Sequence, residues 1–268
     1  MKKWFRIVLQ MLKWLLLVTY CFVILSFVND KSHQLICNKI NVNIADSLES
    51  QFITKRDVIK VLTSKSETPI GKPLWQINTH EMEQKFNSKH AIKELAIYKT
   101  ANGALNVKIA QRQPLVRIIN KNNHGYYIDN EGLILPLSYN YTSHVLIING
   151  KITEPFEVAP SVNVLNWASK NDSIETPLIC KLYDLAKYIT DDSFLNAQIA
   201  QVYVNGSNDI ELIPRVGSHV IQFGNPDDKE VKFKKLKLFY ERALPYEGWN
   251  KYKLINLKYK NQIVCTKR

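Results

Sequence analysis

The sequence LAIYKTANGALNVKIAQRQP (residues 95–114) carries two alternating runs on either side of a turn signal. Leu95 and Ile97 stand two residues apart, as apolar residues on one face of a strand do. The run ends at Asn102-Gly103, a pair typical of tight hairpin turns. Leu105, Val107 and Ile109 then alternate in the same way down to Pro114. Side chains two residues apart lie on the same face of a strand, so this stretch predicts an antiparallel hairpin with one buried face.

The residues before the hairpin predict one strand and two helices. Ile40, Val42 and Ile44 alternate as a strand does, and Thr54 stands where it caps a helix over the residues that follow. A second helix is expected from Asn78, with Glu81 three residues later as in a capping box. The predicted order is strand, helix, helix, strand, strand, with both helices on one face of a small sheet. We expect this unit over residues 36–113.

Residues 114–268 predict a second unit that is richer in strands. Short apolar runs separated by Asn and Gly turns predict strands at 116–119, 126–128, 133–135, 145–148, 201–204, 210–213 and 220–223. Two helices are expected, at 177–189 and 226–244, and a last strand from 254 to about 264. The predicted fold class is α+β: an N-terminal transmembrane helix, a small β-α-α-β-β unit, and a mixed β domain with two helices.

The N-terminal end is the most apolar part of the chain. Residues 14–28 (WLLLVTYCFVILSFV) contain no charge, and as a helix they span about 22 Å, less than the ~30 Å of a hydrocarbon core. Extending the span back to residue 7 supplies the missing length if Lys13 snorkels to the interface. Basic residues precede the run and the first acid is Asp30, so the positive-inside rule places residues 1–13 in the cytoplasm and the residues from about Asn29 onward outside. A cleaved signal peptide is the alternative, but residues 26–30 (SFVND) offer no small-residue cleavage site.

Charge and cysteine content exclude several classes of protein. The chain has 36 Lys+Arg against 24 Asp+Glu, and it is 46% hydrophobic, which excludes a disordered protein. An exported basic domain favours anionic lipid or an acidic partner over nucleic acid. No CxxC pair is present, so a zinc ribbon is excluded. Cys37, Cys180 and Cys265 would face an oxidising compartment, where they could form one disulfide at most or remain free thiols.

No catalytic motif is apparent, and we expect no catalytic residues, cofactor or metal. Nucleophile elbows, phosphate loops and metalloprotease helices are absent from the sequence. The acidic pairs Asp191-Asp192 and Asp227-Asp228 stand where helices end or begin. Lone histidines are best interpreted as surface or capping residues. These are His33, His80, His90, His124, His144 and His219.

The carboxyl-terminal stretch, residues 251–268, has six basic residues and no acid. If its strand lies at the edge of a sheet, it offers unpaired backbone N–H and C=O groups. Lysines on an edge usually prevent aggregation, but they also favour an acidic segment that adds to the sheet as a further strand. An ordinary solvated edge is the alternative interpretation.

The order of these features resembles the FtsQ (DivIB) family of bitopic division proteins. Residues 102–114 (NGALNVKIAQRQP) and 127–138 (YIDNEGLILPLS) are similar to the family segments G-x-L-x-I-x-[EQ]-R-x-P and Y-x-D-x-x-G-x-x-x-P-L-S. Residues 255–259 (INLKY) resemble V-D-L-R-Y. The chain departs from the family pattern at Gln111, where many members have Glu, and at Asn256, where many have Asp.

The resemblance implies a fold and a role. The first unit would be a POTRA domain and the second the family's β domain. The protein would be a non-catalytic divisome scaffold in the inner membrane at the division septum, with its C-terminal domains in the periplasm. It would bind the coiled-coil proteins FtsB and FtsL and, through them, act on septal peptidoglycan synthesis by FtsW and FtsI. Carried onto this sequence, the partner-binding residues are Lys258, Tyr259, Lys260, Asn261, Gln262, Ile263 and Val264.

Two other classes of function remain open. A secretion or envelope-assembly component also contains POTRA domains, but usually repeats them or adds a long β-barrel. An anchored cell-wall enzyme would need a nucleophile or metal constellation. The single predicted POTRA unit and the scattered polar residues favour the scaffold.

Overall fold

The structure is a computed structural model that describes residues 2–33, 35–45, 51–64, 68–139, 141–153, 162–166, 176–206 and 209–268. The chain divides into two compact units. One is formed by Met1–Glu49 with Ile53–Gln111, the other by Ser50–Phe52 with Arg112–Arg268.

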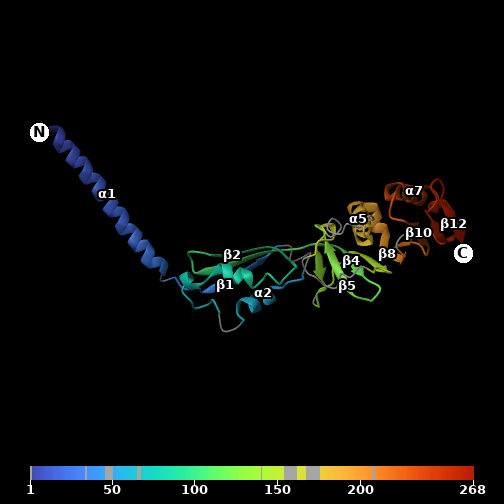
Figure 1. Ribbon diagram of the computed structural model, residues 1–268, viewed down its shortest axis with the longest axis horizontal. Helices are drawn as coiled ribbons and strands as arrows, with labels where there is room; N and C mark the ends of the chain where they lie inside the picture. The colour runs from blue at the N-terminus through green and yellow to red at the C-terminus, as the bar shows by residue number, and fades with distance from the viewer. Residues whose placement is uncertain are drawn as a thin grey trace. The chain divides into compact units, whose positions relative to one another are not determined.

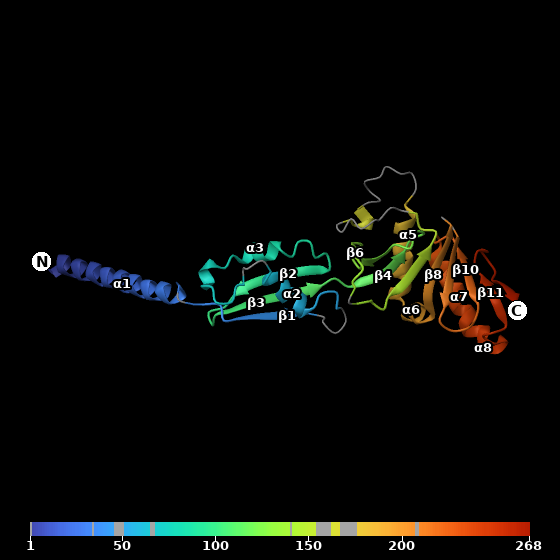
Figure 2. The ribbon, with the colours of Figure 1, turned by 90° about the horizontal axis from the view of Figure 1, so that it is seen from below.

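The first unit is an α+β layer built on a three-stranded sheet of order β1-β3-β2. The hairpin expected from the sequence is present, with β2 and β3 antiparallel, while β1 runs parallel to β3. Figures 1 and 2 show the elements, which are α1 (Lys2–His33), β1 (Lys39–Ile44), α2 (Lys55–Leu62), the 3-10 helix η1 (Leu74–Gln76), α3 (Thr79–Gln84), β2 (Ile92–Lys99) and β3 (Ala104–Gln111).

Local sequence signals explain the turn and the helix starts of this unit. Gly103 has a φ of +81°, and a Cβ at this position would lie 2.7 Å from the carbonyl oxygen of Ile36. Glycine is therefore required both by the turn and by the close approach of the two chain segments. The hydroxyl of Thr54 accepts the amide of Asp57, whose carboxylate accepts the amide of Thr54, so α2 begins with a complete capping box.

Both helices of the first unit bury apolar side chains in one core. Val58 and Leu62 of α2 and Met82 of α3 pack in the same cluster as Leu105 and Val107, which share one face of β3. The helices therefore lie on one face of the sheet, as the sequence predicts.

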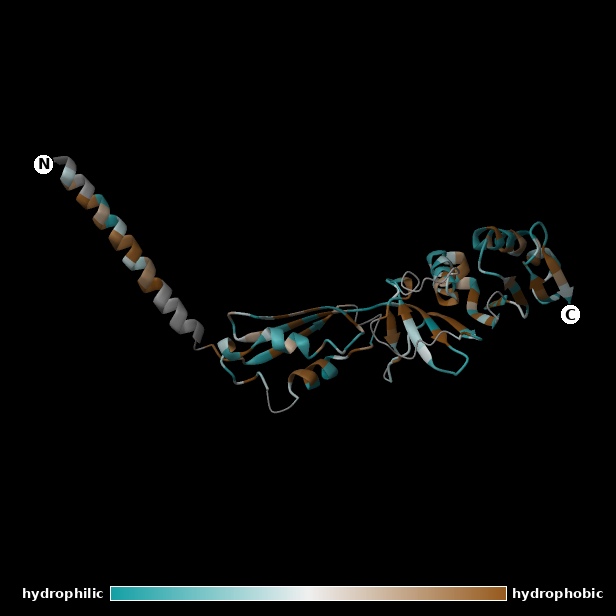
Figure 3. Cartoon of the chain, viewed as in Figure 1, coloured by the Kyte–Doolittle hydropathy of each residue, from teal (hydrophilic) through white to brown (hydrophobic). Residues whose placement is uncertain are grey.

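The N-terminal helix α1 runs from Lys2 to His33 and so begins within the stretch expected to be a tail. Figure 3 shows hydrophobic residues along its middle part. Among the described residues, no helix combines the length and the apolarity that a crossing of the membrane requires. The expected helix is confirmed, and the expected span stays a prediction from the sequence.

The second unit is built on a nine-stranded mixed sheet of order β12-β11-β10-β9-β8-β7-β4-β5-β6. The strand pairs β4/β7, β7/β8 and β10/β11 are parallel and the others are antiparallel. The elements are β4 (Pro114–Ile119), β5 (Gly125–Asp129), β6 (Ile134–Pro136), β7 (Leu146–Gly150), α5 (Leu178–Asp191), α6 (Ser193–Gln198), β8 (Ile199–Gly206), β9 (Asp209–Pro214), β10 (Val220–Gly224), α7 (Lys229–Arg242), α8 (Leu244–Glu247), β11 (Tyr252–Asn256) and β12 (Val264–Lys267).

The expectation of two helices in this unit is wrong, because the short helices α6 and α8 accompany α5 and α7. Asp192 ends α5 and starts α6, where its carboxylate accepts the amide of Leu195. The sequence places a helix end at Asp191-Asp192, but the start of a second helix at the Asp192 cap was not predicted.

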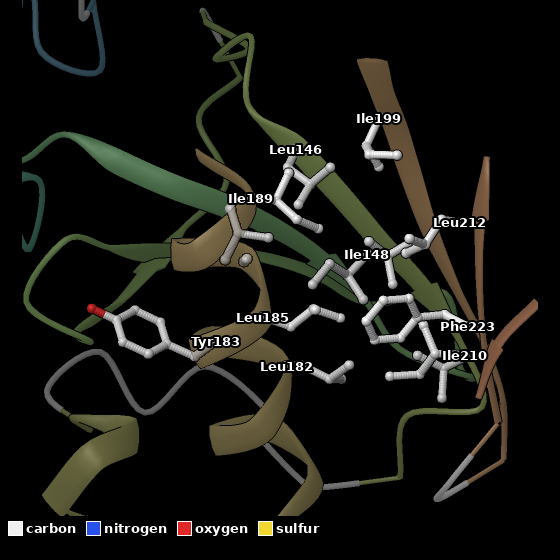
Figure 4. Packing of buried hydrophobic residues seen from close by; sticks show 14 of the residues in the cluster. Leu146, Ile148, Leu182, Tyr183, Leu185, Ile189, Ile199, Ile210, Leu212 and Phe223 are labelled. Atoms are coloured by element: carbon white, nitrogen blue, oxygen red, sulfur yellow. The ribbon is translucent and has the colours of Figure 1, made fainter. Parts of the chain in front are cut away.

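One core joins the helices to the sheet. Figure 4 shows Leu182, Leu185 and Ile189 of α5 pointing toward sheet residues such as Ile148, whereas Tyr183 points away from them. Phe233 of α7 packs against both Tyr188 of α5 and Phe223 of β10, with ring centroids 5.4 and 4.8 Å apart. Helices α5 and α7 therefore cover the same face of the sheet.

Candidate partner-binding edge

Strand β12 is the outermost strand of the nine-stranded sheet, next to the C-terminus (Figure 1). It pairs antiparallel with β11, and among the described residues no other strand lies beside it. The amide of Arg268 donates inward to the carbonyl of Lys251 at 3.2 Å. Successive amides of a strand point to opposite sides, so the amide of Lys267 points outward. The strand therefore offers main-chain groups to an added segment.

The core and the neighbouring strands hold this edge in place. Ile255 and Leu257 are fully buried beneath α7, together with Leu236. The amide of Leu257 donates to the carbonyl of Gln222 at 2.9 Å, and the side chains of Asn256 and Gln222 bond at the same distance. The edge is thus a fixed part of the sheet rather than a loosely attached tail.

The expected single strand from 254 to 264 is wrong, because residues 257–263 interrupt it. The side chain of Asn256 accepts the amide of Lys258 at 2.9 Å, which turns the chain out of the ladder. The ammonium of Lys235 on α7 then donates to the carbonyl of Tyr259 at 2.6 Å and lies 3.4 Å from those of Leu257 and Lys260. These carbonyls therefore bond to a side chain instead of a neighbouring strand.

The structure places most of the seven predicted partner-binding residues in this loop, next to the edge strand. Lys258, Lys260, Asn261 and Gln262 are exposed, and Tyr259 is 49% exposed. Ile263 packs partly against the core, and Val264, 40% exposed, begins β12.

Sequence reasoning missed Cys265, Thr266 and Lys267, which with Val264 form the actual edge. The run Val264-Cys265-Thr266 has the β-branched residues typical of a strand, and this signal could have located it. Cys265 packs partly against the core, while Thr266 and Lys267 are exposed. The edge and the loop together expose main chain, one tyrosine and several lysines.

The polar residues considered for catalysis have structural roles. Asp192 caps α6 and pairs with Lys237, whose hydrogen bond lowers the pKa of this carboxyl group. Asp227 and Asp228 precede α7. Among the described residues, no three His, Cys, Asp or Glu side chains gather in a way that could hold a metal ion.

The expectation that all histidines are surface or capping residues is wrong for His219. This side chain is 2% exposed, and its Nε2 lies 2.7 Å from the hydroxyl of Tyr240 on α7. Burial lowers the pKa of His219 and raises that of Tyr240. The pair joins the start of β10 to the helix above the candidate edge.

The cysteines are free thiols wherever the structure describes them. Cys37 and Cys180 are buried in different units, and Cys265 is half-buried on the edge strand. Desolvation raises the pKa of the Cys37 and Cys265 thiols, which disfavours reactive thiolates there.

These features define a class of protein: a small POTRA-like α+β unit followed by a mixed sheet whose last strand is a free edge. A POTRA-like domain model matches residues 35–110. The family model described as FtsQ/DivIB, C-terminal related, matches residues 113–266, more than half of the chain. The chain belongs to the FtsQ/DivIB family. A comparison with curated proteins found no match.

Family membership confirms the resemblance found in the sequence and indicates a scaffold role in cell division. Proteins of this family are in general not enzymes.

Proposed function

We propose that the protein is a membrane-anchored scaffold of the division machinery. It binds the coiled-coil proteins FtsB and FtsL at the division septum and, through them, helps control septal peptidoglycan synthesis by FtsW and FtsI. The free edge of β12 is the observation that carries this proposal.

The binding mode we propose is addition of a partner strand to β12. Main-chain hydrogen bonds supply affinity and register, while side chains beside the edge supply specificity. Tyr259 offers an apolar ring with a polar tip, half exposed in the adjoining loop. The exposed side chains of Lys260 and Lys267 favour an acidic partner segment, whereas the ammonium of Lys258 pairs with Asp209.

The proposed anchor is the N-terminal helix. Its support is the charge-free run at residues 14–28 and the basic residues before it, which would keep the N-terminus in the cytoplasm of an inner-membrane protein and the two units in the periplasm. The helical form of residues 2–33 is compatible with this role.

The test compares two substitutions at one edge position in the full chain. Lys267→Pro removes the outward amide and adds a ring that blocks a partner strand, whereas Lys267→Thr loses the same charge and keeps the amide. Co-purification of FtsB and FtsL should fall about tenfold or more with Lys267→Pro, since one lost interface hydrogen bond already costs about 1.4 kcal/mol. Lys267→Thr should retain most of the binding.

Equal binding by the two Lys267 variants would contradict strand addition. Tyr259→Ala is a further variant that should leave the sheet intact, because this side chain is half exposed in a loop. Unchanged binding by Tyr259→Ala would remove Tyr259 from the proposed interface. Thermal unfolding of each variant checks that the second unit remains folded.

A further inference from the structure

Three chain segments meet at the end of the first unit where the chain enters from α1, and we call residues 35–38, 69–76 and 99–104 the entry end. The amide of Leu74 donates to the carbonyl of Leu35 at 2.8 Å, and that of Cys37 to the carbonyl of Lys72 at 2.9 Å. The amide of Asn38 donates to the carbonyl of Gly103 at 2.9 Å. These bonds tie the entering chain to the 69–76 loop and to the β2–β3 turn.

Large apolar side chains are exposed on this tied structure. Ile36, Ile70 and Trp75 are 54%, 51% and 57% exposed. Their neighbours Cys37 and Leu74 are buried in the core of the same unit, so the local backbone is fixed. Exposed apolar side chains that gather on a rigid surface indicate an interaction site.

The charge of the entry end is positive. None of its residues is Asp or Glu, and the side chains of Lys72 and Lys99 are exposed. An acid-free surface with two lysines and exposed apolar groups attracts an anionic surface that can also accept a tryptophan ring.

Chain length places this surface close to the end of the proposed anchor. From residue 28, the last of the charge-free run, five helical residues reach His33 and add about 7.5 Å. The two residues to Leu35 add about 7 Å at most. The headgroup layer on one side of a bilayer is about 5–7 Å thick, so a path of at most about 15 Å keeps the entry end within about 10 Å of the lipid headgroups.

We propose that the entry end rests on an anionic lipid surface. Trp75, Ile70 and Ile36 enter the headgroup region, and Lys72 and Lys99 contact lipid phosphates. Tryptophan favours the membrane interface because its ring is apolar and its N–H is polar, and each nearby lysine is attracted to anionic lipid. The inference rests on the proposed anchor and goes beyond it, since it gives the first unit a second contact with the membrane.

The test uses the full chain in vesicles of phosphatidylcholine and phosphatidylglycerol, with or without brominated phosphatidylcholine as a quencher. Fluorescence of the parent minus that of Trp75→Phe isolates the Trp75 emission, because Trp4, Trp14, Trp167 and Trp249 contribute to both. We expect this emission to be shifted to the blue and to lose most of its intensity in brominated vesicles. The same subtraction with Trp249→Phe, in the second unit, is the matched control and should show no quenching.

Two further arms make the inference specific. Ile70→Ser combined with Ile36→Ser should reduce the quenching of Trp75, since the substitutions remove apolar contacts of the patch with lipid. Replacing phosphatidylglycerol by phosphatidylcholine should also reduce it, if the lysines contact anionic headgroups. If neither the serine substitutions nor the change of lipid reduces the quenching of Trp75, the proposed contact is overturned.

An alkaline carbonate wash separates this inference from the proposed function. A chain that stays with the vesicles while the Trp75 emission is not quenched is anchored, and this result overturns the inference. A chain that washes off the vesicles refutes the anchor. Quenching of Trp75 before such a wash would still support the lipid contact. If the Trp75 emission is quenched only when FtsB and FtsL are present, the entry end contacts a protein partner, and this result overturns the inference.

Discussion

At the scale of single residues, the family motifs have structural roles that the sequence does not reveal. One guanidinium nitrogen of Arg112 bonds to the carboxylates of Asp129 and Glu131, both at 2.9 Å. Asp129 also accepts the amides of Glu131 and Leu133, so its buried carboxylate organises the β5–β6 turn. Gln111 accepts the amide of Ile53 at 2.9 Å, a role that a glutamate could also fill.

Buried His219 predicts a pH dependence of stability. Burial lowers its pKa in the folded protein from the ordinary value of 6.5, so the unfolded chain binds a proton more readily. Above about pH 6.5 His219 is neutral in both states and does not lower the free energy of unfolding. As the pH falls from 6.5 toward the folded-state pKa, the unfolded chain takes up a proton and the free energy of unfolding decreases. Urea denaturation of the second unit should show stability that decreases by up to about 1.4 kcal/mol per pH unit in this window.

His219→Gln is the matched control, because the amide can still bond to the hydroxyl of Tyr240 but does not titrate. The variant should lose this part of the pH dependence while it keeps the folded structure. An identical dependence in the parent and in His219→Gln would show that other groups cause it.

At the scale of elements, helix α7 shows how a helical pattern can be placed on the wrong face. The spacing of apolar residues within 226–244 predicts burial of Val231, Leu236, Phe239 and Ala243. Leu236 is buried and Phe239 and Ala243 are half-buried, but Val231 is 54% exposed, and Phe233 and Tyr240 complete the buried stripe. The helix carries apolar residues on several sides, so periodicity alone did not select the face that packs on the sheet. Contact with Phe223 and Tyr188 selects it.

Lys235 on this helix should control the loop before the edge strand. Lys235→Met keeps the apolar stem but removes the ammonium that binds the carbonyls of Leu257, Tyr259 and Lys260. We expect amide exchange in residues 258–262 to accelerate about tenfold, the factor for loss of about 1.4 kcal/mol of local stability. Hydrogen exchange of the full chain provides the measurement.

Lys234→Met is the control for Lys235→Met, since this exposed neighbour carries the same charge on the same helix. Exchange in the loop should not change in this variant. If both variants exchange alike, helix charge rather than carbonyl binding orders the loop.

At the scale of the whole molecule, the residues that the structure describes form two separate cores. One gathers residues such as Val58, Leu105 and Val107, and the other residues such as Ile148, Leu185 and Phe223. Each unit has its own sheet and its own covering helices. This arrangement fits a scaffold in which different surfaces serve different contacts.

The proposed topology predicts the compartment of both units. Alkaline phosphatase fused after Arg268 should be active only if this end lies outside the cytoplasm, and we expect an active fusion. In the proposed topology the basic residues Lys2, Lys3, Arg6 and Lys13 favour this orientation, so their joint replacement by Gln should lower the activity. An inactive parent fusion, with an active fusion of a cytoplasmic fluorescent protein, would contradict the topology.

The sequence by itself determined the local elements. Alternation in residues 95–109, the turn glycine Gly103 and the cap Thr54 identify strands, turn and helix because each signal acts over a few residues. These patterns, with their order along the chain, were sufficient for the α+β class, the order of elements in the first unit and the family.

Only the tertiary structure decided the order of the nine strands, the break at residues 257–263 and the identity of the edge. The edge depends on Lys235 reaching the carbonyl of Tyr259, on Gln222 bonding to Asn256, and on Arg268 pairing with Lys251. These partners are 17 to 34 residues apart in sequence. A local pattern describes which face of one segment is apolar, whereas the pairing of strands depends on contacts between distant segments.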